Sequence, residues 1–314
     1  MAVLLTDPVA LLFPGQGVQR EGMGRKLYDR YPLARVIFER ASDVLHLPMT
    51  RLCLEGPAAE LGRTENLQPA VLTVSWAAHA VFRQERPTAR VAVVAGHSLG
   101  ELAALAAAGA LPWETTLELV RARGELMGAA AADRPGGMLA IVGLGGDAIQ
   151  EILAATATAG RLWIANHNAD EQFVLSGEGP AIQAAERLAL EMGARRALVL
   201  AIPLPAHCPL MERAASAFAL LVDRLPLRAP EVPVLANANA RALTTAVALR
   251  RELAGHLRRP VEWARTMLAM QRMSVRTVVE LGPGRVLASL AAKYMPGVET
   301  WNADELLVDF AGPA

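Results

Sequence analysis

Ser98 is the residue whose surroundings most clearly predict chemistry. It lies in the segment GHSLGE (residues 96–101), between the β-branched run VAVVA and an alanine-rich run. A G-x-S-x-G pattern between a strand and a helix is typical of a nucleophile elbow, a sharp turn that exposes a serine hydroxyl. Gly96 and Gly100 suit such a turn because it brings backbone segments too close for a Cβ. The alternative is an ordinary turn with an inert serine.

A serine hydroxyl needs a base to accept its proton. The chain has six histidines, and in elbow enzymes the base follows the serine, which leaves His167, His207 and His256. His207 follows a strand predicted at 197–202 and precedes a helix, so we expect it at the C-terminal edge of the sheet. His167 reads as a loop residue, and His256 could satisfy the last carbonyls of a helix. Because no acidic residue stands out as a third member, we predict a Ser98–His207 dyad oriented by a backbone or amide carbonyl.

Arg123 is unusual because its helical neighbours are apolar. The residues three and four positions away are Leu119, Val120, Leu126 and Met127, which places the guanidinium on an apolar helix face. An arginine is seldom placed there without an anionic partner. A substrate carboxylate would fit the planar fork of the guanidinium; a snorkelling side chain or an internal ion pair are the alternatives.

Composition narrows the class of protein. The chain has 314 residues and a formal net charge of zero, which argues against non-specific binding of nucleic acid. Its two cysteines form no CxxC motif, so we expect a reducing cytoplasm. Apolar runs are interrupted before 18 residues, and we expect no signal peptide and no transmembrane helix. We also expect a monomer, because no coiled-coil heptad or exposed apolar stripe stands out.

Strands alternate with helices along most of the chain, which favours a mostly parallel sheet covered by helices on both faces. Pro69 is expected at the first position of a helix, where its missing N–H costs nothing. Residues 132–203 instead follow the order β-α-β-β-α-β, typical of a ferredoxin-like unit. We therefore predict an α/β fold in which residues 1–131 and 204–314 form a large subdomain and 132–203 an inserted small one.

Several further motifs occur in a fixed order: FPGQGVQ (13–19), GHSLGE, IANHN (164–168) with VLSG (174–177), PAHC (205–208), PVEW (260–263) and LGPG (281–284). Together they resemble the malonyl-CoA:acyl-carrier-protein transacylase family, including the acyltransferase domains of polyketide synthases. The resemblance covers residues from about 10 to 295. It implies an α/β-hydrolase-like core with an inserted ferredoxin-like subdomain.

The resemblance also implies a two-step, ping-pong acyl transfer through a malonyl-Ser98 ester, with His207 as general base and acid. Malonyl-CoA would be the donor, and the phosphopantetheine thiol of an acyl carrier protein the acceptor, with no bound cofactor and no metal. The resemblance implies that Gln16 and Leu99 form the oxyanion hole and that Arg123 binds the malonyl carboxylate. It implies further substrate contacts from Met127, His97 and Asn166. His256 would orient the base.

Three positions depart from the family's pattern. His256 stands where glutamine or asparagine is common, Leu102 replaces an aromatic residue, and Ala206 replaces a polar or bulky one. The pathway stays open between fatty-acid synthesis, polyketide synthesis and the epsilon subunit of malonate decarboxylase. A thioesterase on the same elbow and a non-catalytic docking subunit are the alternative functions. The arginines at 250–251 and 258–259 could face an acidic carrier protein or simply be solvated.

Overall fold

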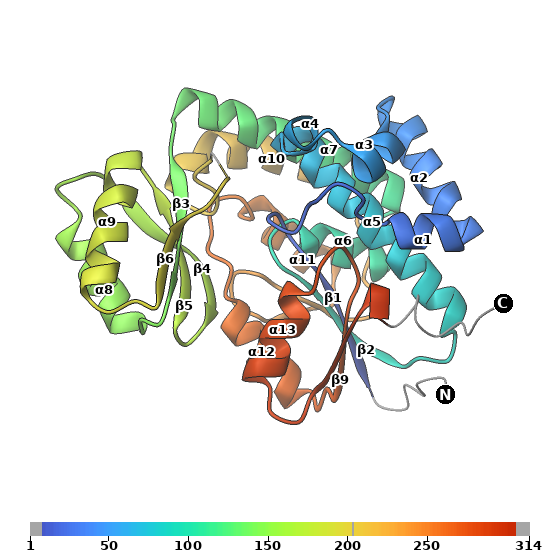
Figure 1. Cartoon of the computed structure of the whole chain (residues 1–314). Helices are drawn as coiled ribbons and strands as arrows, with labels where there is room; N and C mark the ends of the chain where they lie inside the picture. Colours follow the sequence, from blue (N-terminus) through green and yellow to red (C-terminus); the bar gives the residue numbers. More distant parts are fainter. Residues whose placement is uncertain (1–7, 203, 306–314) are drawn as a thin grey trace.

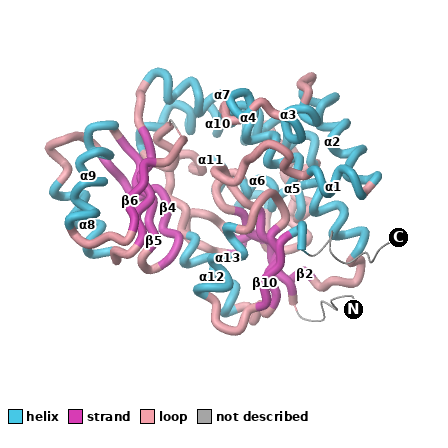
Figure 2. The backbone as a smooth tube through the Cα atoms, in the orientation of Figure 1, coloured by secondary structure: helices cyan, strands magenta, loops and turns pink. Residues whose placement is uncertain are grey.

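The computed structural model describes residues 8–202 and 204–305 and contains two sheets (Figures 1 and 2). The larger sheet has the strand order β10-β9-β1-β2-β7-β8, in which every pair is parallel except β7 and β8. Its strands are β1 (Val9–Phe13), β2 (Val91–Gly96), β7 (Val234–Leu235), β8 (Ala242–Leu243), β9 (Thr277–Glu280) and β10 (Glu299–Asn302).

The smaller sheet is antiparallel throughout and has the order β4-β5-β3-β6. It consists of β3 (Gly137–Val142), β4 (Leu162–Ala169), β5 (Gln172–Gly177) and β6 (Arg196–Val199), with α8 (Gly146–Ala155) and α9 (Gly179–Glu191) between them in the chain. The two helices pack on one face of this sheet (Figure 1). This strand order and chain order are those of a ferredoxin-like unit.

The other helices surround the larger sheet. They are α1 (Arg25–Arg30), α2 (Pro32–Leu45), α3 (Met49–Glu55), α4 (Ala58–Leu61), α5 (Thr64–Glu85), α6 (Gly100–Ala107), α7 (Trp113–Asp133), α10 (Glu212–Asp223), α11 (Ala246–Ala254), α12 (Trp263–Arg272) and α13 (Val286–Tyr294). A short 3₁₀ turn, η1 (Pro209–Met211), precedes α10.

Strand β1 shows how the sequence builds this layered core. Because side chains alternate across a strand, Leu11 and Phe13 enter the cluster formed with α2, α5, α6 and α7. Ala10 and Leu12 enter the opposite cluster, formed with α12 and α13. All five residues of the strand are buried. The parallel sheet is thus covered on both faces, and the predicted α/β class is confirmed.

The prediction for Pro69 is wrong. Helix α5 begins at Thr64, and Pro69 lies inside it. Proline cannot donate the hydrogen bond to the carbonyl four residues earlier, which here belongs to Glu65. The Nη1 group of Arg121 on α7 donates to that carbonyl at 3.0 Å instead. The arginine therefore satisfies the acceptor that the proline leaves open.

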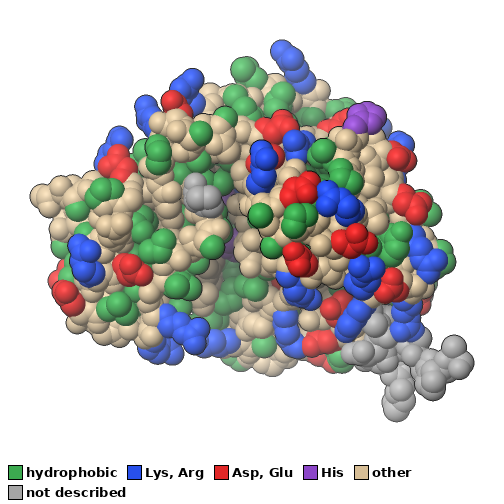
Figure 3. Space-filling model, turned by 45° about the horizontal axis from the view of Figure 1, so that its top comes forward, with side chains coloured by type: hydrophobic (Ala, Val, Ile, Leu, Met, Phe, Trp, Pro, Cys, Tyr) green, Lys and Arg blue, Asp and Glu red, His purple; other side chains and the backbone are tan. Residues whose placement is uncertain are grey.

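Smaller differences concern the ends of elements. The strand expected at 197–202 ends at Val199. A strand is also expected at 232–235, and β7 covers its last two residues, whereas β8 and β10 are not expected from the sequence. Pro203, which lies at the predicted boundary between the subdomains, and both ends of the chain fall outside the described residues. No described helix is long and apolar enough to cross a membrane. Basic and acidic side chains are interspersed over the face shown in Figure 3.

A prediction follows from the contact between β1 and the start of α6. A Cβ on Gly100 would lie 2.0 Å from the carbonyl oxygen of Phe13. Gly100→Ala is therefore expected to lower the free energy of unfolding by about 3 kcal/mol or more, at the upper end of overpacking effects. Urea denaturation measures this. Gly146→Ala is the control, because a Cβ there meets nothing within 4 Å; equal stability of the two variants would contradict the prediction.

Candidate active site

The predicted elbow is present between β2 and α6. Ser98 has a φ of 52°, in the left-handed region that a residue other than glycine rarely adopts. A Cβ on Gly96 would lie 1.9 Å from the carbonyl carbon of Gly100. The turn is therefore so tight that both flanking positions exclude a side chain. Strain of this kind persists only where neighbouring groups hold it.

Asn237, which follows β7, holds the elbow from the side. Its Oδ1 accepts the backbone N–H of Ser98 at 2.7 Å, and its Nδ2 donates to the carbonyl of Gly96 at 2.7 Å. The Asn237 backbone N–H in turn donates to Oε1 of Glu101 at 3.1 Å. One amide side chain thus fixes both sides of the turn, with a buried carboxyl group behind it.

Ser98 and His207 meet as predicted from the sequence. The Oγ atom of Ser98 lies 2.7 Å from Nε2 of His207, and Nδ1 of the same ring lies 3.0 Å from the carbonyl oxygen of Arg259. Because a carbonyl can only accept, Nδ1 carries the proton and Nε2 is free to accept one from the serine. The backbone N–H of His207 donates to the carbonyl of Leu257 at 3.0 Å.

The orientation predicted for His256 needs correction. The group that contacts Nδ1 of His207 is the backbone carbonyl of Arg259, in line with the expected backbone or amide carbonyl. The rings of His207 and His256 lie edge to face with centroids 6.0 Å apart. His256 instead directs its Nε2 to the carbonyl of Ser98 at 3.2 Å, so it contacts the nucleophile's backbone rather than the base.

The surroundings of His207 keep its imidazole neutral. Burial lowers its pKa well below the ordinary value, and the nearby His256 and Arg123 lower it further. The hydrogen bond to Arg259 acts in the opposite direction but is weaker. A neutral imidazole is the form that can accept the serine proton.

Arg123 is fully buried and points at the serine. Its Nη2 lies 3.2 Å from Oγ of Ser98, while Nη1 donates to Oε1 of Gln68 at 2.5 Å. No hydrogen-bond acceptor among the described residues contacts its Nε. The predicted helix face is correct, and the guanidinium faces the nucleophile without a carboxylate in hydrogen-bond contact.

Keeping the charged guanidinium of Arg123 buried costs free energy, because the group loses its hydration. Burial lowers its pKa to about 9, with Glu101 opposing the shift. Burial also raises the pKa of Glu101 to about 8. The guanidinium thus stays protonated at neutral pH in a poorly solvated site, where an anion would be strongly favoured.

The predicted oxyanion donors flank the nucleophile. The Gln16 side chain lines the same cavity as Ser98, and its Nε2 donates to Oγ1 of Thr64 at 2.8 Å. Leu99 follows the serine at the start of α6. Within the described part of the chain, neither the Gln16 nor the Leu99 backbone N–H donates to another group. Both are therefore available to a substrate oxygen.

A cavity of about 390 Å³ brings most of the predicted residues together, with Gln16, His97, Ser98, Asn166 and His207 among its lining. It also includes β3–β6 residues such as Met138 and Val174, and Val286 and Leu290 of α13. Met127 lies outside this lining, one turn after Arg123, and its Sδ accepts a hydrogen bond from Gln68 at 3.5 Å.

His97 and Asn166 have structural contacts in this cavity. The Nε2 atom of His97 lies 2.9 Å from Oδ1 of Asn168, and its ring packs on Trp263 with a centroid distance of 5.6 Å. Asn166 donates to the carbonyl of Ala165 at 2.9 Å. His97 thus joins the elbow to β4, whereas the side-chain contact of Asn166 stays within β4.

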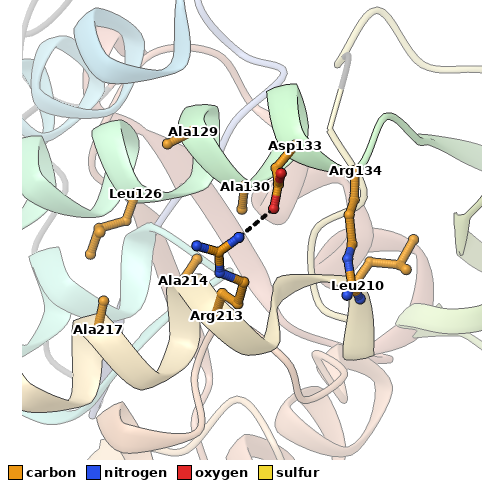
Figure 4. Close-up of a pocket in the computed structure, with 9 residues that line it drawn as sticks. All are labelled: Leu126, Ala129, Ala130, Asp133, Arg134, Leu210, Arg213, Ala214 and Ala217. Atoms are coloured by element: carbon orange, nitrogen blue, oxygen red, sulfur yellow. Dashed lines mark hydrogen bonds and ion pairs between the residues drawn. The ribbon is translucent and has the colours of Figure 1, made fainter.

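Other features carry less chemistry. A cavity of about 320 Å³ between α7 and α10 contains none of the predicted residues, and its Arg213 pairs with Asp133 at 2.5 Å (Figure 4). Three of the four arginines at 250–259 are held within the chain, by the carbonyl of Leu225, Glu212 and Glu252. No cluster of three or more potential metal ligands occurs among the described residues.

Comparison with known proteins decides the family. The acyl transferase domain model matches residues 10–300. The chain belongs to this acyl transferase family. It is 36% identical over 297 residues to the malonyl CoA-acyl carrier protein transacylase of Haemophilus influenzae, covering 95% of each chain.

Solved structures give the same result for this acyl transferase. The malonyl CoA-acyl carrier protein transacylase of Coxiella burnetii is 32% identical with a TM-score of 0.92, over 98% of this chain and 97% of that one. A malonyl-transacylase solved with a type II polyketide acyl-carrier protein is 34% identical with a TM-score of 0.91, over 96% and 99%. The resemblance inferred from the motifs is confirmed.

Four residues of the site were missed by sequence reasoning: Gln68, Asn168, Asn237 and Arg259. Gln68 lies one turn after Thr64, to which its Nε2 donates at 2.8 Å, and the sequence around it indicates only a helix and no contact with Arg123. Asn168 belongs to the recognised IANHN motif. Arg259 acts through its carbonyl, and no side-chain pattern can reveal a backbone contact.

The lowered pKa of His207 predicts the pH dependence of serine reactivity. Labelling of Ser98 by a fluorophosphonate probe is expected to stay level as pH falls from ~8 to about 6.5, the ordinary histidine value, and to decline only below it. Arg123→Met removes a positive charge that lowers this pKa, so its acidic limb should move to higher pH. A wild-type midpoint at or above the ordinary value would contradict the prediction.

Proposed function

We propose that this acyl transferase is a malonyl-CoA:acyl-carrier-protein S-malonyltransferase. The observation that carries the proposal is the buried guanidinium of Arg123, 3.2 Å from Oγ of Ser98 and without a carboxylate in hydrogen-bond contact. Malonyl thioesters end in a free carboxylate that can supply this missing partner. The relatives named as malonyl CoA-acyl carrier protein transacylases support the same substrate.

In the first half-reaction, Oγ of Ser98 attacks the thioester carbonyl of malonyl-CoA while Nε2 of His207 takes the hydroxyl proton. The negative charge on the carbonyl oxygen is held by the backbone N–H groups of Leu99 and Gln16. As the tetrahedral intermediate collapses, the C–S bond breaks and the coenzyme A sulfur receives the proton from His207. The malonyl group is left as an ester on Ser98.

In the second half-reaction, the phosphopantetheine thiol of the carrier protein attacks this ester. Nε2 of His207 takes the thiol proton, and the same two N–H groups hold the oxyanion. The C–O bond to Ser98 then breaks and Oγ regains its proton from His207. The enzyme returns to its starting state without a metal or bound cofactor, because every proton moves between the substrate thiols, Ser98 and His207.

Arg123 explains why a dicarboxylic acyl group is preferred. Its guanidinium can bind the carboxylate with two parallel hydrogen bonds, and Gln68 holds the Nη1 end in place. A neutral acyl group such as acetyl leaves the buried charge unpaired, which is costly. The roles of Met127, His97 and Asn166 as further substrate contacts are part of this proposal.

The wider setting also belongs to the proposal. We propose a cytoplasmic monomer that serves fatty-acid or polyketide synthesis; a Burkholderia thailandensis polyketide biosynthesis protein, 38% identical over 91% of this chain and 24% of its own length, supports the second pathway. We also propose the division into subdomains at residues 131/132 and 203/204. No role for nucleic acid or membrane is included.

The first prediction concerns the covalent intermediate. Mixing the protein with malonyl-CoA is expected to add one malonyl group, detected by intact-mass spectrometry, because the ester persists until a thiol arrives. Ser98→Ala should abolish the addition. Labelling that survives this substitution would refute the proposal, and rapid loss of the malonyl group without carrier protein would instead indicate a hydrolase.

The second prediction concerns the carboxylate. Arg123→Ala is expected to lower kcat/KM for malonyl-CoA by ~100-fold, the loss typical of truncating one partner of a buried charge pair. The value for acetyl-CoA should change much less, so the ratio of the two shifts toward acetyl. Arg134→Ala, which removes a charge just after the same helix, is the control. An unchanged ratio in Arg123→Ala would exclude the carboxylate role.

A further inference from the structure

His256 holds the peptide group that joins Ser98 to Leu99. Its Nε2 lies 3.2 Å from the carbonyl oxygen of Ser98, and its side chain is fully buried. A carbonyl oxygen can only accept a hydrogen bond, so this contact requires a proton on Nε2. The imidazole therefore acts as a donor to this carbonyl, and His256 is not among the residues that line the cavity.

Glu101 lies beside the same ring nitrogen of His256 but does not decide its tautomer. Its Oε2 is 3.1 Å from Nε2 and completes no hydrogen bond of its own. Because burial raises the pKa of Glu101 to about 8, this carboxyl group is mostly protonated at neutral pH. Its Oε1 accepts the backbone N–H of Asn237 at 3.1 Å, which keeps Glu101 in this place. The Nε2–H form is the one that the Ser98 carbonyl requires.

The ring stays neutral, so it acts through its dipole and not through a charge. Burial and, after it, the charge of Arg123 lower the pKa of His256 to about 3, against the opposing effect of Glu252. Neutrality matters because His207, 6.0 Å away between ring centroids, must itself become positively charged during proton transfer. A charged neighbour at this distance would oppose that step.

The two ends of the Ser98–Leu99 peptide are electronically linked. In a planar trans peptide, the C=O of Ser98 and the N–H of Leu99 point in opposite directions. A hydrogen bond donated to the carbonyl polarises the group and strengthens the N–H as a donor. It also fixes the rotation of the peptide plane, and thereby the direction of the N–H.

We propose that His256 is a positioning residue that aims and strengthens the Leu99 N–H of the oxyanion hole through the Ser98–Leu99 peptide. This inference rests on the proposed function, because it requires Leu99 to donate to the oxyanion of a malonyl thioester. It replaces the expected role of His256, orientation of the base His207, with a role at the oxyanion hole. The Asn237 bond to the Ser98 N–H fixes the preceding peptide. The Ser98 carbonyl also accepts the backbone N–H of Glu101 at 2.9 Å, so His256 is the second donor to this oxygen and the one that comes from a side chain.

The test uses two substitutions of His256 that remove its N–H donor and a third that keeps a donor. His256→Leu and His256→Phe have no N–H, whereas His256→Gln can still donate from a side-chain amide. The readout is the rate of malonyl-Ser98 formation in rapid-quench mass spectrometry. Deleting an oxyanion donor outright costs ~10²–10³-fold; because Leu99 N–H remains, we expect a loss of about tenfold in the first two variants and near-complete rescue in the third.

Two measurements separate positioning from a general structural effect. The dissociation constant for malonyl-CoA, measured in a Ser98→Ala background, should be unchanged by His256→Leu. The infrared stretch of the isotope-labelled ester carbonyl in malonyl-Ser98 should move to higher frequency in the Leu and Phe variants, because its hydrogen bond weakens, and return in the Gln variant. His79→Leu is the control, since His79 is also buried but contacts Phe13 and Trp76.

The outcomes distinguish the two proposals. A wild-type acylation rate and carbonyl frequency in either donor-free variant would overturn the role of His256 while leaving the proposed function intact. The same holds if His256→Gln is as slow as His256→Leu. Failure of the wild-type protein to form malonyl-Ser98 at all would instead refute the proposed function.

Discussion

The close approach of the elbow to the end of β1 is the constraint on which the rest of the site depends. Gly100 can start α6 only where the backbone of Phe13 passes, with no space for a methyl group between them. Strand β1 also leads directly into the segment that contains Gln16. One backbone contact therefore sets the distance between the nucleophile and both proposed oxyanion donors, and the parallel pairing of β1 with β2 maintains it.

The electrostatics of the site follow from burial more than from pairing. Arg123, Glu101, His207 and His256 are all buried, and desolvation is the largest cause of the pKa shift of each. The two histidines are kept neutral, whereas the guanidinium keeps its proton. The site thus combines a buried positive charge on Arg123 with a neutral His207 that can accept a proton.

The sequence predicted that Ser98, His207 and Arg123 meet and that the fold is layered, because both leave patterns in side-chain type. The elbow, the apolar face around Arg123 and the βαββαβ order were each visible in residue spacing. The supporting contacts were not. The Arg259 carbonyl leaves no side-chain signal, Asn237 acts from a segment 139 positions away from Ser98, and Pro69 misled because Arg121 satisfies the carbonyl it leaves open. Contacts of this kind join residues that are far apart in the sequence, so residue spacing does not reveal them.

The contact between α5 and α7 has a consequence for how selectivity could change over time. A Cβ on Gly124 would lie 2.7 Å from the backbone of Glu65, so the two helices touch there. Arg121 contacts α5 at this point, through the carbonyl of Glu65, and Arg123 contacts it one turn further along, at Gln68. A shift of α7 along α5 would therefore break the hydrogen bonds of both arginines and move the Arg123 guanidinium relative to Ser98. The cavity residues on β3–β6 lie outside this helix pair, so substitutions there can change the width of the cavity and leave Arg123 in place.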